Sequence, residues 1–333
     1  MQVNSQQANT VGSQAEPAVL KDNQTRIDGV GLDNTSQPGS RPLDELVPSR
    51  YAMKVGDIDV MVISDGMLSL PTAMLGHNAD AAVRAAWLND MFLPTDMLEW
   101  ALNVVVVRSG DRTILIDAGM GAEFPDLPRV GRLGHRLEAA GIDLASVTDV
   151  VLTHMHMDHV GGLLVDGVRD RLRPDLRIHL ASAEAEFWES PDFSRVSMPP
   201  GFPDALRATA KRFLKDYRNQ MRTFDTECEV APGVVAHRTG GHTPGHSVVR
   251  LASGGDRLTF AGDALFAVAF DHPDWYNGFE HDPEEAARVR VRLLRELAAN
   301  REPLVATHLP FPSVCHVAVA GDVFRCVPAV WDY

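Results

Sequence analysis

The chain has 333 residues, of which 45% are hydrophobic and 23% are charged, close to the average for a globular protein. Its formal net charge is 31 − 45 = −14, which argues against nucleic acid or an anionic membrane surface as the main partner, because both need a basic footprint. No segment approaches the roughly 20 apolar residues that cross a bilayer, and the N-terminus lacks the pattern of a signal peptide. We therefore expect a cytoplasmic protein.

The N-terminal segment, residues 1–48, differs in composition from the remainder. It is rich in Gln, Asn, Ser, Gly and Pro and has little apolar periodicity, so it cannot bury enough surface to offset its ordering entropy. We expect an arm that is disordered or loosely attached over residues 1–48, followed by one folded domain over residues 49–333.

The apolar pattern of the folded part predicts a hairpin over residues 55–66 that stops at Asp65-Gly66, and then a mixture of strands and helices. The expected strands cover residues 103–108, 113–116, 147–153, 178–181, 234–239, 247–251, 258–261 and 304–307. The expected helices cover residues 79–91, 133–140, 183–189, 205–218 and 283–300. Two β-rich halves that each carry helices indicate a pair of packed sheets with helices outside.

Three histidines and one aspartate fall within the six residues 154–159, whose sequence is HMHMDH. This segment follows a buried strand directly, and strand alternation turns His154 and His156 to the same side. Packing four such side chains at the mouth of a strand without a metal would cost desolvation and mutual repulsion. The segment therefore predicts a metal site.

Further ligand-type side chains stand at the ends of other expected strands, beside glycine or proline. They are His242, Asp263 and His308. Loops that leave a rigid scaffold at such positions concentrate functional residues. The total of five histidines and two aspartates suits two borderline divalent metals, with a carboxylate able to bridge them. We expect two zinc ions per chain, with Mn, Fe or Co as alternatives.

This set of motifs resembles that of the metallo-β-lactamase-fold hydrolases. The resemblance rests on H-x-H-x-D-H at residues 154–159, G-H-T-P-G-H at residues 241–246, Gly262-Asp263 and the late His308. It covers about residues 51–333. It implies an α/β (α+β) protein built as a four-layer αββα sandwich, with a dinuclear site at one edge.

The resemblance also implies a role for each motif residue. His154, His156 and His242 would hold the first metal. Asp158, His159 and His308 would hold the second metal, and Asp263 would bridge the two. Asp117, in Ile116-Asp117-Ala118-Gly119, would support the site from behind. His246, which belongs to the same glycine-rich motif as His242, is expected to orient its loop or to hydrogen-bond a ligand.

Shorter motifs look like those of methyl parathion hydrolase and its relatives. They are Ser64-Asp65-Gly66, Ile116-Asp117-Ala118-Gly119, Glu186-Phe187-Trp188, His308-Leu309-Pro310-Phe311-Pro312 and Phe324-Arg325-Cys326-Val327-Pro328. The related homoserine-lactone hydrolases carry a tyrosine three residues after the bridging aspartate. Here that position is Phe266, which weakens the lactonase interpretation without ruling it out. The relatives are commonly homodimers, so a homodimer is expected.

Two metals a few ångströms apart can hold a bridging hydroxide and lower its pKa toward neutrality, so that it serves as the nucleophile. Asp158 and Asp263 are the expected catalytic residues, because either could accept the proton. Aromatic residues near the expected strand ends predict an apolar pocket for a neutral small molecule. The candidate pocket residues are Trp100, Trp188, Phe266, Phe270, Trp275 and Phe311.

The leading hypothesis is a dinuclear zinc hydrolase that cleaves an activated, aromatic substrate in xenobiotic degradation or detoxification. An aryl phosphotriester, a lactone and an aryl ester all fit. One alternative is a hydrolytic dehalogenase of an electron-poor chloroaromatic, similar to chlorothalonil dehalogenase. Another is a non-hydrolytic metal or redox module, which is disfavoured because the chain has no C-x-x-C motif and no attached flavin or rubredoxin domain.

Overall fold

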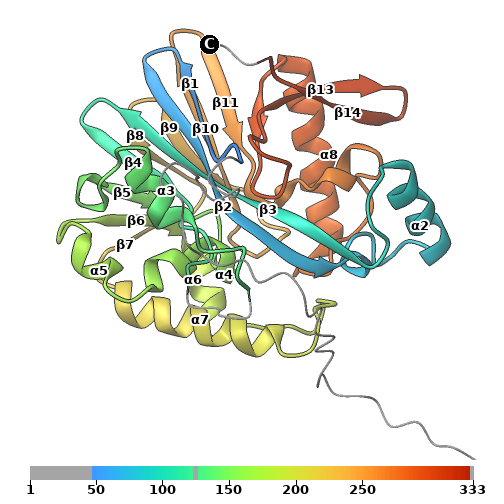
Figure 1. The fold of residues 1–333 in the computed structure, drawn as a ribbon, viewed down its shortest axis with the longest axis horizontal. Helices are drawn as coiled ribbons and strands as arrows, with labels where there is room; N and C mark the ends of the chain where they lie inside the picture. The colour runs from blue at the N-terminus through green and yellow to red at the C-terminus, as the bar shows by residue number, and fades with distance from the viewer. Residues whose placement is uncertain (1–46, 123–126, 331–333) are drawn as a thin grey trace, which may run out of the picture. The chain divides into compact units, whose positions relative to one another are not determined.

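A computed structural model of the chain describes residues 47–122 and 127–330. The described residues form two seven-stranded sheets with helices on both sides (Figure 1). The arm expected over residues 1–48 lies almost wholly outside the described residues. The arm and its boundary with the folded domain therefore stay predictions.

The first sheet mixes antiparallel and parallel pairs. Its strands, in order, are β1 (Arg50–Val55), β2 (Ile58–Pro71), β3 (Met97–Ser109), β4 (Arg112–Ile116), β5 (Asp149–Val151), β6 (Arg177–Ala181) and β7 (Met221–Phe224). Pairing is antiparallel from β1 to β4 and parallel from β4 to β7. The carboxyl ends of β4, β5 and β6 therefore reach the same edge of the sheet.

The second sheet follows later in the chain. Its strands are β8 (Glu227–Ala231), β9 (Val234–Arg238), β10 (Ser247–Ser253), β11 (Asp256–Phe260), β12 (Leu304–Val305), β13 (Cys315–Ala320) and β14 (Val323–Pro328). Strand β11 pairs parallel with β12 and antiparallel with β10. The ends of β11 and β12 and the start of β10 consequently share one edge.

Helices cover the outer face of each sheet (Figure 1). They are α2 (Ala81–Asp90), α3 (Leu133–Ala139), α4 (Met157–Val160), α5 (Val168–Arg171), α6 (Ser182–Glu189), α7 (Phe202–Tyr217) and α8 (Pro283–Asn300). Short 3₁₀ helices lie at Thr72–Met74, Leu144–Ser146, Gly161–Leu164, Gly262–Ala264 and Ala267–Phe270. Among the described helices, none combines the length and the apolar character that crossing a membrane requires.

Three apolar clusters hold the layers together. Between the sheets, Val105 and Ile116 of the first pack in one buried cluster with Val249 and Phe260 of the second. Helix α7 joins the cluster on the outer face of the first sheet, and α8 joins the cluster on the outer face of the second. Each fully buried side chain of this size contributes about 1.5–3 kcal/mol. The four-layer αββα sandwich predicted from the sequence is confirmed.

The predicted end of the first hairpin is wrong. Strand β2 does not stop at Asp65-Gly66 but continues to Pro71, with a shift of register between Ser64 and Gly66 where the strand bulges. Gly66 adopts a φ of 123°, and the Asp65 carboxylate accepts hydrogen bonds from the backbone N–H groups of Met120 and Leu133, at 2.8 and 2.7 Å. A β-bulge uses the same residue types as a turn, which explains the error.

Candidate metal centre

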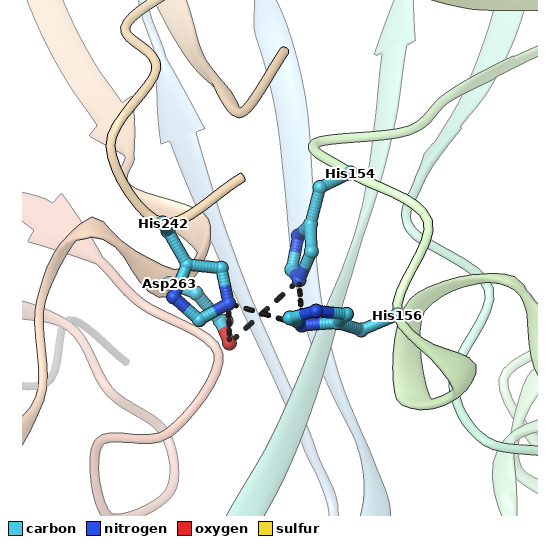
Figure 2. A group of neighbouring side chains, drawn as sticks. All are labelled: His154, His156, His242 and Asp263. Atoms are coloured by element: carbon cyan, nitrogen blue, oxygen red, sulfur yellow. Dashed lines mark hydrogen bonds and ion pairs between the residues drawn. The ribbon is translucent and has the colours of Figure 1, made fainter. Parts of the chain in front are cut away.

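The candidate metal centre lies where strand ends of the two sheets meet. His154 and His156 follow β5 of the first sheet, whereas His242 precedes β10 and Asp263 follows β11 of the second. Figure 2 shows these four side chains, the first ligand group, pointing toward one another, with His154 and His156 on one segment and His242 and Asp263 on the opposite side. The Nδ1 atom of His156 lies 2.9 Å from Nε2 of His154 and 3.1 Å from Nε2 of His242.

Asp158, His159 and His308 form the second ligand group. The Oδ2 atom of Asp158 lies 3.5 Å from Nε2 of His159 and 3.4 Å from Nε2 of His308. Asp263 joins this group to the first. Its Oδ1 lies 3.3 Å from Nε2 of His159, and its Oδ2 lies 3.1 Å from Nε2 of His308. The same Oδ2 lies 3.4 Å from Nε2 of His242, so one carboxylate contacts both groups.

Burial keeps the imidazoles of the first group neutral. Desolvation, reinforced by the neighbouring histidines, lowers the pKa of His154 and of His242 well below 6.5. Burial also lowers the pKa of His156, to about 3. A neutral imidazole has a free lone pair, which is the form that binds a metal.

Opposite charges face each other in the second group. Burial opposes the charged form of His159, but the carboxylates of Asp158 and Asp263 outweigh it and raise the pKa of His159 well above 6.5. The pKa of His308 is also raised, because Asp263 outweighs burial there. Burial alone would raise the pKa of Asp263, yet His308 and His159 hold it well below 3.8. In the metal-free protein, protons on these histidines balance the carboxylates.

The donor set fits a pair of zinc ions. Nε2 of His159 and Oδ1 of Asp263 are buried 3.3 Å apart as an ion pair, but neither makes a hydrogen bond of good geometry to the described residues. Within the first group, Nε2 of His154 lies 2.9 Å from Nδ1 of His156 and 3.9 Å from Oδ2 of Asp263. Tetrahedral ligands at 2.0–2.1 Å from zinc would stand about 3.3 Å apart. Imidazole nitrogens and carboxylate oxygens are ligands that zinc accepts.

Asp117, which the resemblance implied to lie behind the site, contacts His159 of the second group. Its Oδ2 accepts a hydrogen bond from Nδ1 of His159 at 2.8 Å, and its Oδ1 accepts one from the backbone N–H of Thr153 at 2.8 Å. The first contact turns Nε2 of His159 toward Asp158 and Asp263. Such carboxylate–histidine pairs fix the orientation of a metal-ligating ring.

Two further contacts orient ligands. Nδ1 of His308 donates to the carbonyl oxygen of Ala101 in β3 at 2.9 Å, which leaves Nε2 as the lone-pair atom. His246 acts on Asp263, because its Nε2 accepts the backbone N–H of that residue at 3.1 Å while its Nδ1 contacts Oγ1 of Thr239 at 2.8 Å. The structure thus places His246 behind the carboxylate that both groups share.

Sequence reasoning missed Glu184, a fully buried carboxylate in α6. Its Oε1 accepts the backbone N–H of Met155 at 2.9 Å and Nε1 of Trp188 at 2.7 Å. Its Oε2 accepts hydrogen bonds from the hydroxyl of Thr243 at 2.6 Å and from the backbone N–H of Gly245 at 3.0 Å. Glu184 therefore ties the His154–His156 loop to the His242 loop.

Asn103 was missed as well. It is fully buried in β3, and its Nδ2 donates to the carbonyl oxygens of Thr307 and Leu309 at 3.0 and 2.7 Å. These two residues flank His308, so Asn103 holds the loop that carries this ligand. The sequence did contain a signal for this role: Asn103 is the single amide within the apolar run 101–107, and a buried amide needs hydrogen-bond partners.

A cavity of about 30 Å³ adjoins both ligand groups. It is lined by Leu68, Leu70, Trp100, His156, Met157, Asp158, Phe202, Leu206, His242, Asp263, Phe266, Phe279 and His308. Larger hollows of about 720 and 520 Å³ elsewhere contain none of the candidate ligands. This volume has room for about one water molecule.

The predicted pocket residues divide between this cavity and other places. Trp100 and Phe266 line it, whereas Trp188 does not but lies behind His156, with ring centroids 5.8 Å apart. The other three predicted residues are absent from the lining, because each is used for packing. Phe270 packs with the α8 cluster, Trp275 stacks on His272 and Phe311 packs with the cluster between the sheets.

Comparison with known proteins agrees with this arrangement. Residues 99–308 match the family described as the metallo-beta-lactamase superfamily. A "Probable metallo-hydrolase" of Mycobacterium tuberculosis is 24% identical over 226 residues, which cover 59% of this chain and 68% of that protein. Residues 99–308 make up more than half of the chain and include every member of both ligand groups.

Two solved structures are similar over nearly their whole length. One is AidC, a dizinc quorum-quenching lactonase in complex with its product N-hexanoyl-L-homoserine, and the other is the hydrolase AbOPH of the beta-lactamase superfamily. Each has a TM-score of 0.76 and 25% identity, covering 86% of this chain and 99% of the other. With the fold, the ligand groups and these relatives in agreement, the chain belongs to the metallo-β-lactamase superfamily and is a metal-dependent hydrolase.

Proposed function

We propose that the chain is a dinuclear zinc hydrolase of neutral, activated esters: lactones, aryl phosphotriesters or aryl carboxylesters. The observation that carries this proposal is the position of Asp263. Its carboxylate lies 3.4 Å from His242 of the first ligand group and 3.1 Å from His308 of the second, as a bridging ligand requires.

In this proposal His154, His156 and His242 would hold the first metal. Asp158, His159 and His308 would hold the second, and Asp263 would be shared between them. When bound, the two zinc ions would supply a water of lowered pKa as nucleophile and polarise the oxygen of the electrophile.

Asp158 and Asp263 are the candidate acceptors for the proton that the nucleophilic water releases. Burial would raise the pKa of Asp158, but His159 and His308 lower it below 3.8, so this carboxylate is ionised at neutral pH. Asp263 is ionised for the same reason, and its Oδ1 has no hydrogen-bond partner among the described residues. Either carboxylate is therefore able to accept the proton released as the ester is attacked.

The cavity lining supports a neutral substrate. Apart from the candidate ligands, its residues are apolar or aromatic, and the described lining includes no lysine or arginine. A phosphodiester anion or a nucleotide would find no cationic side chain there, whereas alkyl and aryl groups would be desolvated favourably. Ester hydrolysis of an apolar small molecule is the activity that this lining favours.

The similarity to AidC, a dizinc lactonase, supports a lactone as the substrate. Phe266 argues the other way at one position, because the related homoserine-lactone hydrolases carry a tyrosine there. The short motifs that resemble those of methyl parathion hydrolase support an aryl phosphotriester. The homodimer, the cytoplasmic location and the role in xenobiotic degradation stay predictions.

A small substrate panel tests the proposal. The protein is stripped with a chelator, reloaded with zinc, and assayed with N-hexanoyl-L-homoserine lactone, an aryl phosphotriester, a nitrophenyl ester and chlorothalonil. We expect zinc-dependent turnover of at least one ester. Chloride release from chlorothalonil without ester turnover would support the dehalogenase alternative, and zinc-loaded protein inactive on all four would overturn the proposal.

A further inference from the structure

One residue of the cavity lining that is not a candidate metal ligand carries a polar hydrogen. Among the described lining residues other than those ligands, Trp100 alone has a side chain with an N–H or O–H group. The indole is 4% exposed, and its Nε1 has no hydrogen-bond partner among the described residues. Buried indole N–H groups usually find an acceptor, so this donor requires an explanation.

Other tryptophans of the same fold show the usual arrangement. Nε1 of Trp87 donates to Oδ2 of Asp271 at 2.9 Å, and Nε1 of Trp188 donates to Oε1 of Glu184 at 2.7 Å. Neither residue lines the cavity. Trp100, whose indole N–H has no acceptor among the described residues, by contrast belongs to the lining of the cavity next to the candidate metal ligands.

The indole of Trp100 is also held in place. It packs against Phe266 and His308, with ring centroids 5.1 Å away in each case, and against Phe279 at 6.4 Å. Its backbone is paired with Leu68 across two strands of the first sheet. A donor fixed in this way binds an acceptor without an ordering cost, and it penalises a ligand that leaves it unpaired.

We propose that the indole N–H of Trp100 recognises the substrate by donating a hydrogen bond to a carbonyl or phosphoryl oxygen. The apolar lining binds the remainder of the molecule, and Trp100 selects molecules that carry an acceptor oxygen beside their apolar groups. This inference rests on the proposed ester hydrolysis. It disfavours an apolar molecule that offers no hydrogen-bond acceptor, because such a molecule would leave the donor unpaired.

The test replaces one atom on each partner. Trp100 is exchanged for β-(3-benzothienyl)alanine, which keeps the shape of the indole but has sulfur in place of N–H, and Trp100→Phe serves as a second variant. The ester that wild-type protein hydrolyses fastest is compared with its analogue in which the acceptor oxygen is sulfur, a weaker acceptor. For the lactone this oxygen is the acyl amide oxygen, and for the phosphotriester it is the phosphoryl oxygen.

Wild-type protein should prefer the oxygen form, and both variants should lose about fivefold to tenfold of that preference in kcat/KM, mainly through KM. Trp87→Phe is the matched control, since it removes an indole N–H outside the cavity and should leave the preference unchanged. Thermal unfolding and zinc content of each variant show whether the fold and the metal centre are intact.

Two results would overturn the inference. If the oxygen-to-sulfur preference is the same within about twofold in wild type and in the benzothienyl variant, Trp100 does not recognise that oxygen. This outcome leaves the proposed function standing, because wild-type turnover has been measured. If wild-type protein hydrolyses no ester, the proposed function fails and the role of Trp100 fails with it.

Discussion

The two ligand groups of the candidate metal centre differ in how the protein prepares them. In the first group, burial keeps three imidazoles neutral, and Glu184 of α6 ties together the two loops that carry them. In the second group, histidines of raised pKa face carboxylates, and the support comes from Asp117 and β3.

Each ligand group is therefore supported mainly by its own set of neighbouring residues. Glu184 makes its four hydrogen bonds to residues around the first group. Asp117 bonds directly to His159 of the second group and to Thr153, whose Oγ1 also lies 3.1 Å from Nδ1 of His154. Asp263 is the candidate ligand that contacts both groups. The groups should therefore lose their metals separately when a supporting residue is changed, and together when Asp263 is changed.

The largest effect is expected from Asp263→Asn, which removes the charge that both groups share. Metal content should fall at both positions, and kcat/KM should fall by more than about 100-fold, because a direct ligand matters more than its supports. Elemental analysis and the ester assay measure this. Retention of two metals with full activity would show that Asp263 bridges nothing.

Glu184→Gln should act on the first group alone. The neutral amide replaces one acceptor oxygen by a donor, so a backbone N–H or hydroxyl loses its partner and the histidine loops loosen. Metal affinity at the first group should fall about 10- to 100-fold, with the second group little changed. Competition with a chelator resolves the two affinities.

Glu302→Gln is the matched control for Glu184→Gln. Glu302 is also buried and accepts a hydrogen bond from Thr259 in β11, away from both ligand groups. It should lower stability without changing metal affinity. Equal loss of metal from both groups in Glu184→Gln would contradict separate support.

Asp117→Asn should act mainly on the second group. It removes the charge that orients His159 through Nδ1, so metal affinity at the second group should fall about 10- to 100-fold. Asp149→Asn is the control, because this buried aspartate contacts Arg112 and His179 at the far end of β5. A loss confined to the first group would reverse the assignment.

Asn103→Ala should give a smaller effect that is mainly on stability. Two carbonyl groups beside His308 lose their side-chain donor, at a cost of about 1–3 kcal/mol in the free energy of unfolding. Urea unfolding of the metal-free protein measures this cost. An unchanged unfolding midpoint would show that water replaces the amide without penalty.

The smallest expected effect is a difference between the two groups in how metal affinity depends on pH. Raised pKa values mean that His159 and His308 hold protons above pH 6.5, so metal binding at the second group must displace them, and its affinity should rise with pH near neutrality. The first group has lowered pKa values, is already neutral there and should bind without proton release. Calorimetric titration in buffers of different ionisation enthalpy distinguishes the two. Proton release of equal size at both groups would contradict the difference.

The two packed sheets and the seven candidate ligands could be predicted from the sequence, because strands and ligand motifs both leave short local patterns. Apolar runs reveal buried strands, and His154 to His159 stand in one segment directly after such a run. The spacing of His242, Asp263 and His308 at later strand ends follows from the same logic. The end of strand β2 was predicted too early because the β-bulge at Gly66 has the residue types that are typical of a turn.

The supports and the cavity could not be predicted in the same way. Glu184 contacts Met155 and Gly245 through the tertiary fold, and no local pattern marks a helix residue as buried beneath two loops. Aromatic residues carried too little information, because Phe270 and Phe311 pack in cores with the same side-chain chemistry that Phe266 presents to the cavity. Only three-dimensional packing separates these cases.

The measurement that tests the central claim most directly is the metal content of the purified protein, followed through chelation and re-addition of zinc. The account predicts about two zinc ions per chain, loss of ester hydrolysis when they are removed, and recovery when they return. One metal or none, with hydrolysis that a chelator does not affect, would contradict it.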